Sequence, residues 1–394
     1  MKRVALRPEN AHQARLLHLL QDGPRSRAEL GDVVELSRSK LAVEVGRLTE
    51  LGLIEEAGLA ASRGGRRAAV VRLSQRLRFA AIDIGATSVD VAVTGGDLEI
   101  LAHAAEPCDV RDGPDAVLSV ALEALGKLRS RGIATELHGV GVGVPGPVSF
   151  RDGFPVAPPI MPGWDRYPVR DVLAQQLGCP ALIDNDVNIM ALGEMHAGVA
   201  KTVDDFLLVK IGTGIGCGIV VDGEIYRGVS GCAGDIGHIR VNDDGPACSC
   251  GNTGCLEAYF GGAALARQAE EAARSGASGH LAERLAQAGR LTAEDVGTAA
   301  AAGDAVAIAI IRDGGRRVGQ VLAGLVSFFN PGLVVIAGGL AGLGHVLLAE
   351  IRSVVYRRSL PLATGNLPIT LAELGDTCGV VGAAKLISSH VFSH

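Results

Sequence analysis

The sequence predicts an α/β protein preceded by a small, mainly helical module. From Arg78 onward, apolar strand-like runs alternate with helix-like segments, which is typical of an α/β fold. Before Arg78 the apolar residues recur mainly at helical spacing. The charge changes at the same place: residues 1–78 carry 15 Lys and Arg against 9 Asp and Glu, whereas the remaining residues carry 22 against 34. We therefore expect a basic module joined to an acidic body.

The chain's length and composition point to a cytoplasmic protein. Its 394 residues suffice for two or three domains, and no uncharged run is long enough to span a bilayer. Met1-Lys2-Arg3 is not followed by the apolar block of a signal peptide. The eight cysteines are therefore expected to be reduced, and no membrane partner is expected.

The N-terminal module contains three predicted helices. Leucines between Leu16 and Leu20 mark the apolar face of the first helix, which Asp22-Gly23-Pro24 ends. Ser26-Arg27-Ala28-Glu29 has the form of a capping box and predicts the start of a second helix. Ser37 is the predicted cap of a third helix, in which apolar residues recur between Leu41 and Leu51.

A predicted hairpin with a basic tip follows these helices. Strand-like segments at residues 52–56 and 68–73 flank a turn rich in glycine and arginine. Three helices and such a hairpin describe a winged helix-turn-helix, whose third helix enters the major groove of DNA. The alternative is a small protein-interaction domain whose arginines are only solvated. The residues predicted to contact DNA are Arg38, Ser39, Lys40, Arg47, Arg63, Arg66 and Arg67.

Two strand–turn–strand segments of the body carry glycine-rich turns. The first contains Asp83-Ile84-Gly85-Ala86-Thr87 and the second contains Gly212-Thr213-Gly214-Ile215-Gly216. Such turns expose backbone N–H groups that can cradle phosphate, and glycine permits close approach. Asp83 is placed to hold a water on Mg²⁺, which prefers oxygen ligands. Either turn alone is equally consistent with a plain hairpin.

A third glycine turn, Gly338-Gly339, follows the predicted buried strand 333–337. Glycine here would let the backbone approach a flat base. Tight packing of a strand against a helix explains the same pair equally well.

A candidate reactive group lies where another predicted strand ends. Ala181-Leu182-Ile183 leads into Asp184-Asn185-Asp186-Val187-Asn188, and a helix is predicted over Ile189 to His196. Ligands bind at the carboxyl ends of strands in α/β sheets, where a carboxylate can accept a hydroxyl proton during phosphoryl transfer. The alternative is a group of residues that only caps the helix.

One short stretch combines an imidazole with three thiols. His238, Cys248, Cys250 and Cys255 lie within eighteen residues, and glycines between them allow a compact loop. Three thiolates and one histidine match the ligand set of a closed structural Zn²⁺ site. The alternative is a buried histidine beside core or disulfide cysteines.

These motifs together resemble the ROK family (repressors, unidentified open reading frames and sugar kinases), over the chain from about His12 onward. The matching motifs are Asp83 to Thr87, Val144-Pro145-Gly146-Pro147, Asn185-Asp186-Val187-Asn188, Gly212 to Gly216, and Gly237-His238 through Cys248-Ser249-Cys250-Gly251 to Gly254-Cys255-Leu256-Glu257. The resemblance implies an actin/hexokinase-like pair of α/β lobes behind the winged helix-turn-helix. The implied domains are 1–76 and 77–394, with lobe I at about 77–196 plus 376–394 and lobe II at about 197–375.

The resemblance also implies roles for residues between the lobes. Asp186 would take the proton of a sugar hydroxyl, and Asp235 stands where the family usually has Glu. The implied sugar-binding residues are Gly146, Pro147, Asn185, Asp186, Asp235, His238 and Glu257, of which His238 also ligates zinc. The implied nucleotide-binding residues are Asp83, Gly85, Thr87, Gly212, Thr213, Gly214, Gly216, Gly338 and Gly339.

The first phosphate loop departs from the pattern of the family's kinases, Asp-hydrophobic-Gly-Gly-Thr-Lys. Ala86 replaces the second glycine, and its Cβ would crowd the phosphates. Ser88 replaces the lysine, so that a cation which would stabilise the transferred phosphoryl group is missing. The sequence therefore predicts a sugar-responsive regulator with a structural Zn²⁺, which binds operator DNA as a homodimer or homotetramer. The alternative is a sugar kinase for a hexose or N-acetylhexosamine that uses ATP and Mg²⁺, including a bifunctional protein with weak kinase activity.

Overall fold

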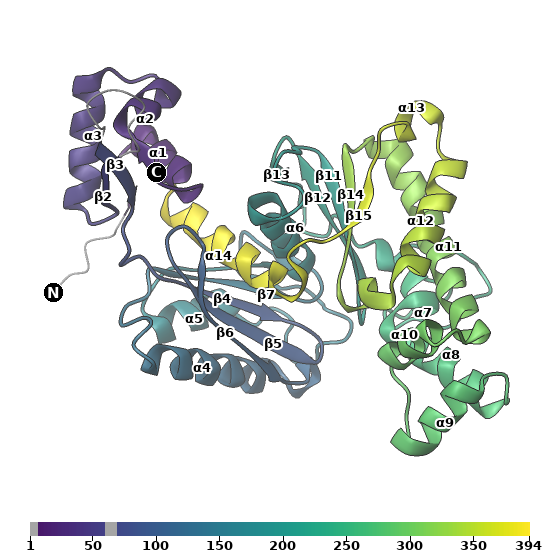
Figure 1. The fold of residues 1–394 in the computed structure, drawn as a ribbon. Helices are drawn as coiled ribbons and strands as arrows, with labels where there is room; N and C mark the ends of the chain where they lie inside the picture. The colour runs from purple at the N-terminus through teal and green to yellow at the C-terminus, as the bar shows by residue number, and fades with distance from the viewer. Residues whose placement is uncertain (1–6, 60–68) are drawn as a thin grey trace.

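The computed structural model describes residues 7–59 and 69–394 (Figure 1). Its N-terminal module is a winged helix-turn-helix. The module consists of α1 (Ala11–Gln21), β1 (Arg25–Ser26), α2 (Arg27–Val34), α3 (Arg38–Glu50), β2 (Ile54–Leu59) and β3 (Ala69–Leu73), with strand order β1-β3-β2. The predicted capping box of Ser26 and Glu29 is present, and the Ser37 side chain accepts from the backbone N–H of Lys40, as predicted.

The body contains two five-stranded sheets with the same topology. The sheet of the N-lobe, which corresponds to the predicted lobe I, has the order β10-β7-β4-β5-β6. The sheet of the C-lobe, which corresponds to the predicted lobe II, has the order β13-β12-β11-β14-β15. In each, an antiparallel meander of three strands is extended by two parallel strands. The strands are β4 (Phe79–Ile84), β5 (Ser88–Thr94), β6 (Ile100–Pro107), β7 (Gly139–Val144), β10 (Ala181–Asn185), β11 (Phe206–Ile211), β12 (Ile215–Val221), β13 (Glu224–Ile225), β14 (Leu333–Ala337) and β15 (Ile369–Leu371), with a small hairpin of β8 (Val148–Ser149) and β9 (Phe154–Pro155). This duplicated arrangement is the actin/hexokinase-like fold that the resemblance implies.

Helices cover both faces of each sheet because the central strands are apolar on both sides. In the N-lobe, α4 (Pro114–Ser130) and α5 (Val169–Leu177) pack against one face, with η1 (Val110–Asp112) before α4. In the C-lobe the outer layer consists of η2 (Ile236–His238), α7 (Leu256–Phe260), α8 (Gly262–Arg274), α9 (Gly279–Ala288), α10 (Ala293–Ala301), α11 (Ala305–Phe329), η3 (Gly339–Leu343), α12 (His345–Arg358) and α13 (Pro361–Thr364). All five residues of β14 are buried, as expected of a central parallel strand.

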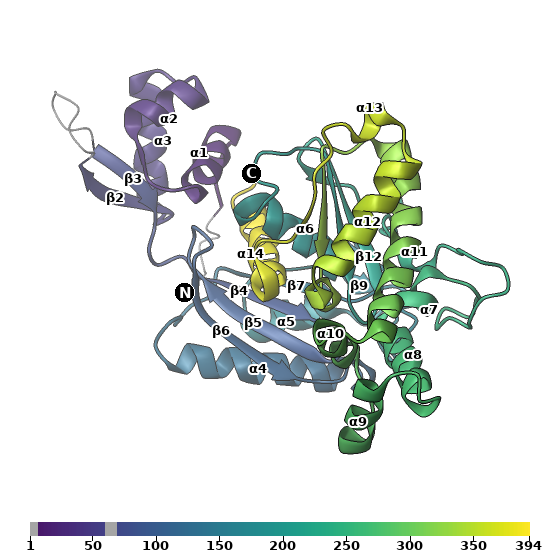
Figure 2. The same ribbon diagram turned by 45° about the vertical axis from the view of Figure 1, so that its right-hand side comes forward.

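Two helices, α6 (Asp186–Ala197) and α14 (Cys378–Val391), lie between the two sheets, and η4 (Gly375–Thr377) leads into α14 (Figure 2). Glycines allow them to pack in close contact: a Cβ at Gly193 would clash with the carbonyl oxygen of Cys378, and one at Gly382 with that of Ile189. The helix predicted from Ile189 in fact begins at Asp186, because the Asn185 side chain caps it. Of the polar residues in this segment, Asp184 and Asn185 end β10, whereas Asp186 and Asn188 lie in the first turn of the helix.

The N-terminal module packs on the body through the end of α14. Leu16, Leu17 and Leu20 of α1 belong to one apolar core with Phe79 and Phe392. The rings of Phe79 and Phe392 meet edge to face with centroids 5.8 Å apart. Among the described residues, no helix is both long and apolar enough to cross a membrane.

Candidate functional site

The predicted zinc ligands converge in one loop. The ligand atoms of His238, Cys248, Cys250 and Cys255 all lie within 4.8 Å of one another. Nδ1 of His238 is 3.4 Å from Sγ of Cys248, and Sγ of Cys250 is 3.7 Å from Sγ of Cys255. That sulfur separation is far longer than the ~2.05 Å of a disulfide, and all eight cysteines of the chain are free. The disulfide alternative is therefore wrong, and the donor set fits a tetrahedral metal ion.

Local backbone geometry brings these ligands together. Gly251 and Gly254 have φ of 89° and 73°, in the left-handed region that glycine adopts without strain. The backbone N–H of Cys248 donates to the carbonyl oxygen of Asn252 (2.8 Å), which closes a tight turn. A hydrogen bond from the backbone of Asn252 is the main cause that lowers the pKa of Cys250 to about 7. This favours the thiolate, which is the form that binds metal.

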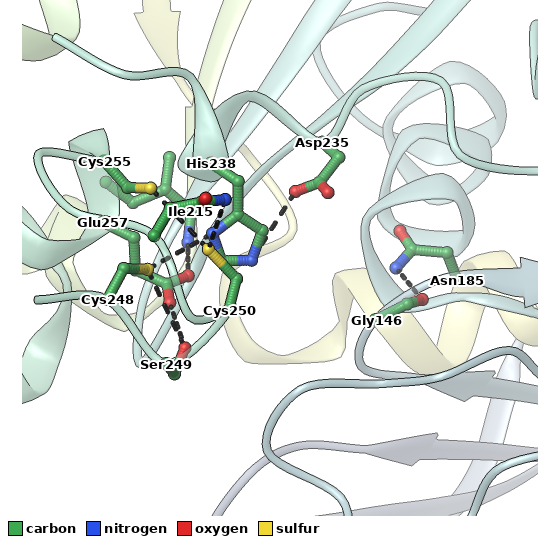
Figure 3. A network of polar contacts seen from close by, with 11 residues as sticks. Gly146, Asn185, Ile215, Asp235, His238, Cys248, Ser249, Cys250, Cys255 and Glu257 are labelled. Carbon is green, nitrogen blue, oxygen red and sulfur yellow. Dashed lines mark hydrogen bonds and ion pairs between the residues drawn. The ribbon is translucent and has the colours of Figure 1, made fainter.

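The predicted sugar-binding residues of the C-lobe surround the same loop (Figure 3). Nε2 of His238 lies 3.9 Å from Oδ1 of Asp235, so the ring presents one nitrogen to the cysteines and the other to this carboxylate. Oε2 of Glu257 accepts from the backbone N–H of Ile215 (3.2 Å), and Ser249 Oγ donates to Oε1 of Glu257 (3.4 Å). Glu257 thus joins the cysteine loop to the second glycine-rich turn.

The predicted sugar-binding residues of the N-lobe face this group from the other side in Figure 3. Oδ1 of Asn185 accepts from the N–H of Val187 (2.9 Å), and Nδ2 donates to the carbonyl oxygen of Gly146 (2.9 Å). Gly146 has φ of 81°, and Pro147 after it accepts at its carbonyl oxygen from Val156 N–H (2.9 Å). The capping role of Asn185 is confirmed, whereas its sugar-binding role stays a prediction.

Asp186 is ion-paired with a lysine that the sequence motifs do not indicate. Only 6% of Asp186 is exposed, and Oδ2 of its carboxylate pairs with Nζ of Lys210 from β11. The pair links the two lobes, since Asp186 begins α6 and Lys210 belongs to the sheet of the C-lobe. The signal in the sequence is weak: a single lysine interrupts the run Phe206-Leu207-Leu208-Val209-Lys210-Ile211, which otherwise reads as a buried strand.

Asp83 lies nearby at the end of β4. Its Oδ1 is buried and has no hydrogen-bond partner among the described residues. Burial raises the pKa of Asp83 to about 7, while the positive charge of Lys210 acts in the opposite direction and the negative charge of Asp186 adds to the rise. The structure therefore places Asp83, Asp186 and Lys210 within one electrostatic cluster.

A second cation, Arg227, pairs with the carboxyl end of β10. Asp184 is almost fully buried, and its Oδ2 lies 2.7 Å from the guanidinium of Arg227, which enters from the C-lobe. The same carboxylate accepts from Asn188 Nδ2 (2.8 Å), and Arg227 stacks on the ring of Phe150 with its Cζ 4.0 Å from the centroid. The carboxylate of Asp184 and the guanidinium of Arg227 therefore satisfy each other directly beside Asn185 and Asp186.

The two predicted phosphate turns occupy equivalent places in the two lobes. Gly85 and Thr87 join β4 to β5, while Gly212, Thr213 and Gly214 join β11 to β12, whose second residue is Gly216. Gly338 follows β14 with φ of 86°, and a Cβ there would lie 2.5 Å from the carbonyl oxygen of Ile211. A close approach to the backbone of β11 thus requires glycine at 338. Nothing lies within 4 Å of a Cβ placed at Gly339.

The predicted DNA-binding residues of α3 are exposed, but one of them is engaged in an ion pair. Arg38, Ser39 and Lys40 are exposed in the first turn of the helix. Arg47 is also exposed, but its guanidinium pairs with Glu9 at 2.5 Å. Arg63, Arg66 and Arg67 lie outside the described residues.

Comparison with known proteins identifies the family. The ROK family model matches residues 79–390. The chain belongs to the ROK family.

Relatives of this ROK protein fall into two groups that differ in length. The xylose repressor of Caldicellulosiruptor bescii is 27% identical over 93% of this chain and 92% of the repressor. A solved ROK family transcriptional regulator, described as a homologue of the E. coli Mlc protein, has a TM-score of 0.82 at 26% identity and covers 96% of this chain and 95% of its own.

The kinase relatives match the body. The glucokinase of Halalkalibacterium halodurans is 35% identical over 78% of this chain and 94% of the kinase. The Streptomyces griseus ROK glucokinase, solved with glucose and AMPPNP, has a TM-score of 0.71 at 29% identity and covers 79% of this chain and 99% of its own. The winged helix-turn-helix in front of the body is thus the architecture of the family's repressor branch.

Proposed function

We propose that this ROK protein is a sugar-responsive transcription regulator. The observation that carries the proposal is the winged helix-turn-helix joined to a complete ROK body, an architecture matched along nearly the whole chain by a ROK transcriptional regulator and a xylose repressor. The exposed Arg38, Ser39 and Lys40 begin the helix that would enter the major groove. Because one winged helix contacts only a short half-site, the functional unit is a homodimer or a homotetramer.

The effector is a sugar that binds between the two lobes. Asp235, His238 and Glu257 lie on the C-lobe side of this region and Asn185 on the N-lobe side (Figure 3), and together they offer the acceptors and donors that hydroxyl groups require. Zn²⁺ bound by the four-residue cluster would fix Nδ1 of His238 on the metal, so that Nε2 carries the proton and can donate to the sugar. The metal thus acts as a brace for the effector site.

A continuous set of contacts leads from this site to the DNA-binding module. Asn185 and Asp186 begin α6, which packs tightly on α14. At the other end of α14, the buried Gln21 of α1 donates to Ser388 Oγ (2.9 Å) and accepts from Lys385 Nζ (2.8 Å). A shift of α6 on sugar binding would therefore move α14. The movement would reach α1 through the buried hydrogen bonds of Gln21, because breaking these bonds costs free energy.

Replacement of Gln21 is expected to uncouple sugar binding from DNA binding. Gln21→Ala removes both side-chain bonds to α14, so the sugar-induced change in operator affinity should fall at least about fivefold, within the usual range of allosteric coupling. The measurement is fluorescence anisotropy of a labelled operator with and without sugar. Gln268→Ala is the matched control, since it removes a half-buried amide that, among the described residues, donates to the Tyr259 carbonyl oxygen within the C-lobe. Equal sugar responses in Gln21→Ala and the unaltered protein would contradict this route.

A sugar screen tests the proposed function as a whole. A hexose, pentose or N-acetylhexosamine that binds the folded protein should raise its melting temperature by several degrees, and Asp186→Asn should remove that shift. The same sugar should change the affinity of the unaltered protein for its operator. If no sugar changes operator binding while a truncated chain without residues 1–75 still binds the operator, the proposal is wrong.

The second candidate function is a sugar kinase, favoured by Asp186 and by the glucokinase relatives. A coupled assay of ADP release distinguishes the two. We expect turnover well below about 1 s⁻¹, the low end of ordinary enzymes. Faster turnover that Asp186→Asn abolishes would establish the kinase instead.

A further inference from the structure

We propose that Lys210 is a resident cation of the site between the lobes, whose ammonium pairs with Asp186 and takes the place of the Mg²⁺ that Asp83 and Asp186 would otherwise attract. The inference rests on the proposed sugar-sensing function and deepens it. It implies that the chain recognises its sugar without Mg²⁺ or nucleotide. The carboxylate that a kinase would use as a base would then serve this chain as a sugar acceptor.

The first step of the argument is position. Lys210 belongs to β11, two residues before the Gly212 turn, and its Cε lies 3.8 Å from where a Cβ of Gly212 would stand. Its side chain thus runs alongside the predicted phosphate turn toward Asp186, with which it pairs. Its charge also acts on Asp83 at the corresponding turn of the other lobe. No other lysine or arginine of the described residues has an ion pair with either of these two carboxylates.

The second step is charge. Two carboxylates alone would form a doubly negative site with oxygen ligands, which attracts a divalent cation. With Lys210 inserted, one carboxylate is already neutralised, and a metal ion would have to approach a fixed ammonium in a poorly solvated place. Two like charges a few ångströms apart repel strongly there. Mg²⁺ therefore does not fit the residues of this chain.

The third step concerns the unpaired oxygen of Asp83. Buried Oδ1 of Asp83 needs a donor, which a metal-bound water would supply in a kinase. Where Lys210 stands in place of the metal, a water or a sugar hydroxyl can supply that donor. Burial raises the pKa of Asp83 to about 7, which weakens this carboxyl as a ligand for a metal ion.

The pair also changes what Asp186 can do. A carboxylate held by an ammonium is a weaker proton acceptor, but it still has lone pairs that accept a hydrogen bond from a sugar hydroxyl. The ion pair joins α6 to the C-lobe, so a sugar that bonds to Asp186 acts on a contact that already links the lobes. Sugar sensing needs the hydrogen-bond acceptor and the contact between the lobes, whereas phosphoryl transfer is hindered by the weaker basicity of Asp186.

The test uses Mn²⁺ as a probe of the metal position, in full-length protein loaded with Zn²⁺. Titration followed by the electron paramagnetic resonance of free Mn²⁺ should show no site in the unaltered protein tighter than about 1 mM. Lys210→Met should gain one site at least tenfold tighter, and Lys210→Met/Asp83→Asn should lose it again. Lys201→Met, an exposed lysine nine positions earlier, should behave like the unaltered protein.

Three results would overturn the proposal. The first is that the unaltered protein binds Mn²⁺ or Mg²⁺·AMPPNP as tightly as Lys210→Met does. The second is that added Mg²⁺ and ATP change the sugar affinity of the unaltered protein more than twofold. The third is that Lys210→Met abolishes an ADP release that the unaltered protein performs. The titration of the unaltered protein decides the question even if Lys210→Met fails to fold, and Lys210→Gln provides a second, polar replacement. Loss of operator binding would refute the regulator while leaving these metal titrations interpretable.

Discussion

Cys250→Ser is expected to remove the bound zinc and, with it, most of the affinity for sugar. Three remaining ligands cannot close the tetrahedron, and coupled metal binding contributes about 10–16 kcal/mol to the folding of zinc-finger peptides. Without the metal, His238 loses its fixed orientation and the loop that carries Ser249 no longer supports Glu257. Since each lost hydrogen bond to a buried polar group costs ~1–3 kcal/mol, sugar affinity should fall at least tenfold.

The measurements are zinc content per chain by mass spectrometry, the melting temperature, and a sugar titration. Cys232→Ser is the matched control, because Cys232 is an exposed free thiol close to the cluster in sequence but outside it. The unaltered protein and Cys232→Ser should each hold about one zinc per chain. A Cys250→Ser protein that keeps its zinc contradicts the metal site, and one that loses zinc but binds sugar normally contradicts the brace.

The second large effect is expected on the affinity for operator DNA. Arg38→Ala/Lys40→Ala removes two exposed cations from the first turn of α3, and we expect operator affinity to fall at least 100-fold. If both side chains contact phosphates, the slope of log affinity against log salt concentration should also become shallower by about 1.8. The sugar-induced rise in melting temperature should stay unchanged, since these residues lie on the module and not between the lobes.

Anisotropy titrations at several salt concentrations provide the measurement. Arg357→Ala/Arg358→Ala is the matched control: it removes two exposed arginines from the end of α12, on the C-lobe (Figure 1). If the two double variants lose operator affinity equally, the effect is one of net charge, and α3 is not the recognition helix.

Local sequence signals correctly predicted two helix caps and the convergence of the four metal-ligating side chains. Ser26 and Glu29 formed the predicted capping box, and Ser37 capped α3, because caps depend on residues three or four positions apart. The metal ligands were predictable for a similar reason: four donors within eighteen residues can meet only in one loop. The roles of the sugar-binding and nucleotide-binding residues came from the family resemblance and stay predictions, as does the boundary between residues 76 and 77.

What the sequence could not reveal were pairs between residues far apart in the chain. Lys210 reads as an interruption of a strand, and Arg227 as an ordinary loop cation, until the fold brings them to Asp186 and Asp184. The same holds for Gln21 and Ser388, which are 367 positions apart.

The sequence by itself thus determined the family, the fold class and the cluster of four metal-ligating side chains, because each depends on residue types at short spacing. Only the tertiary structure decided which charged groups pair between the lobes and which contacts join α14 to the N-terminal module. Electrostatic pairing and helix contact depend on distance in space, and that distance is set when the two lobes close on α6 and α14.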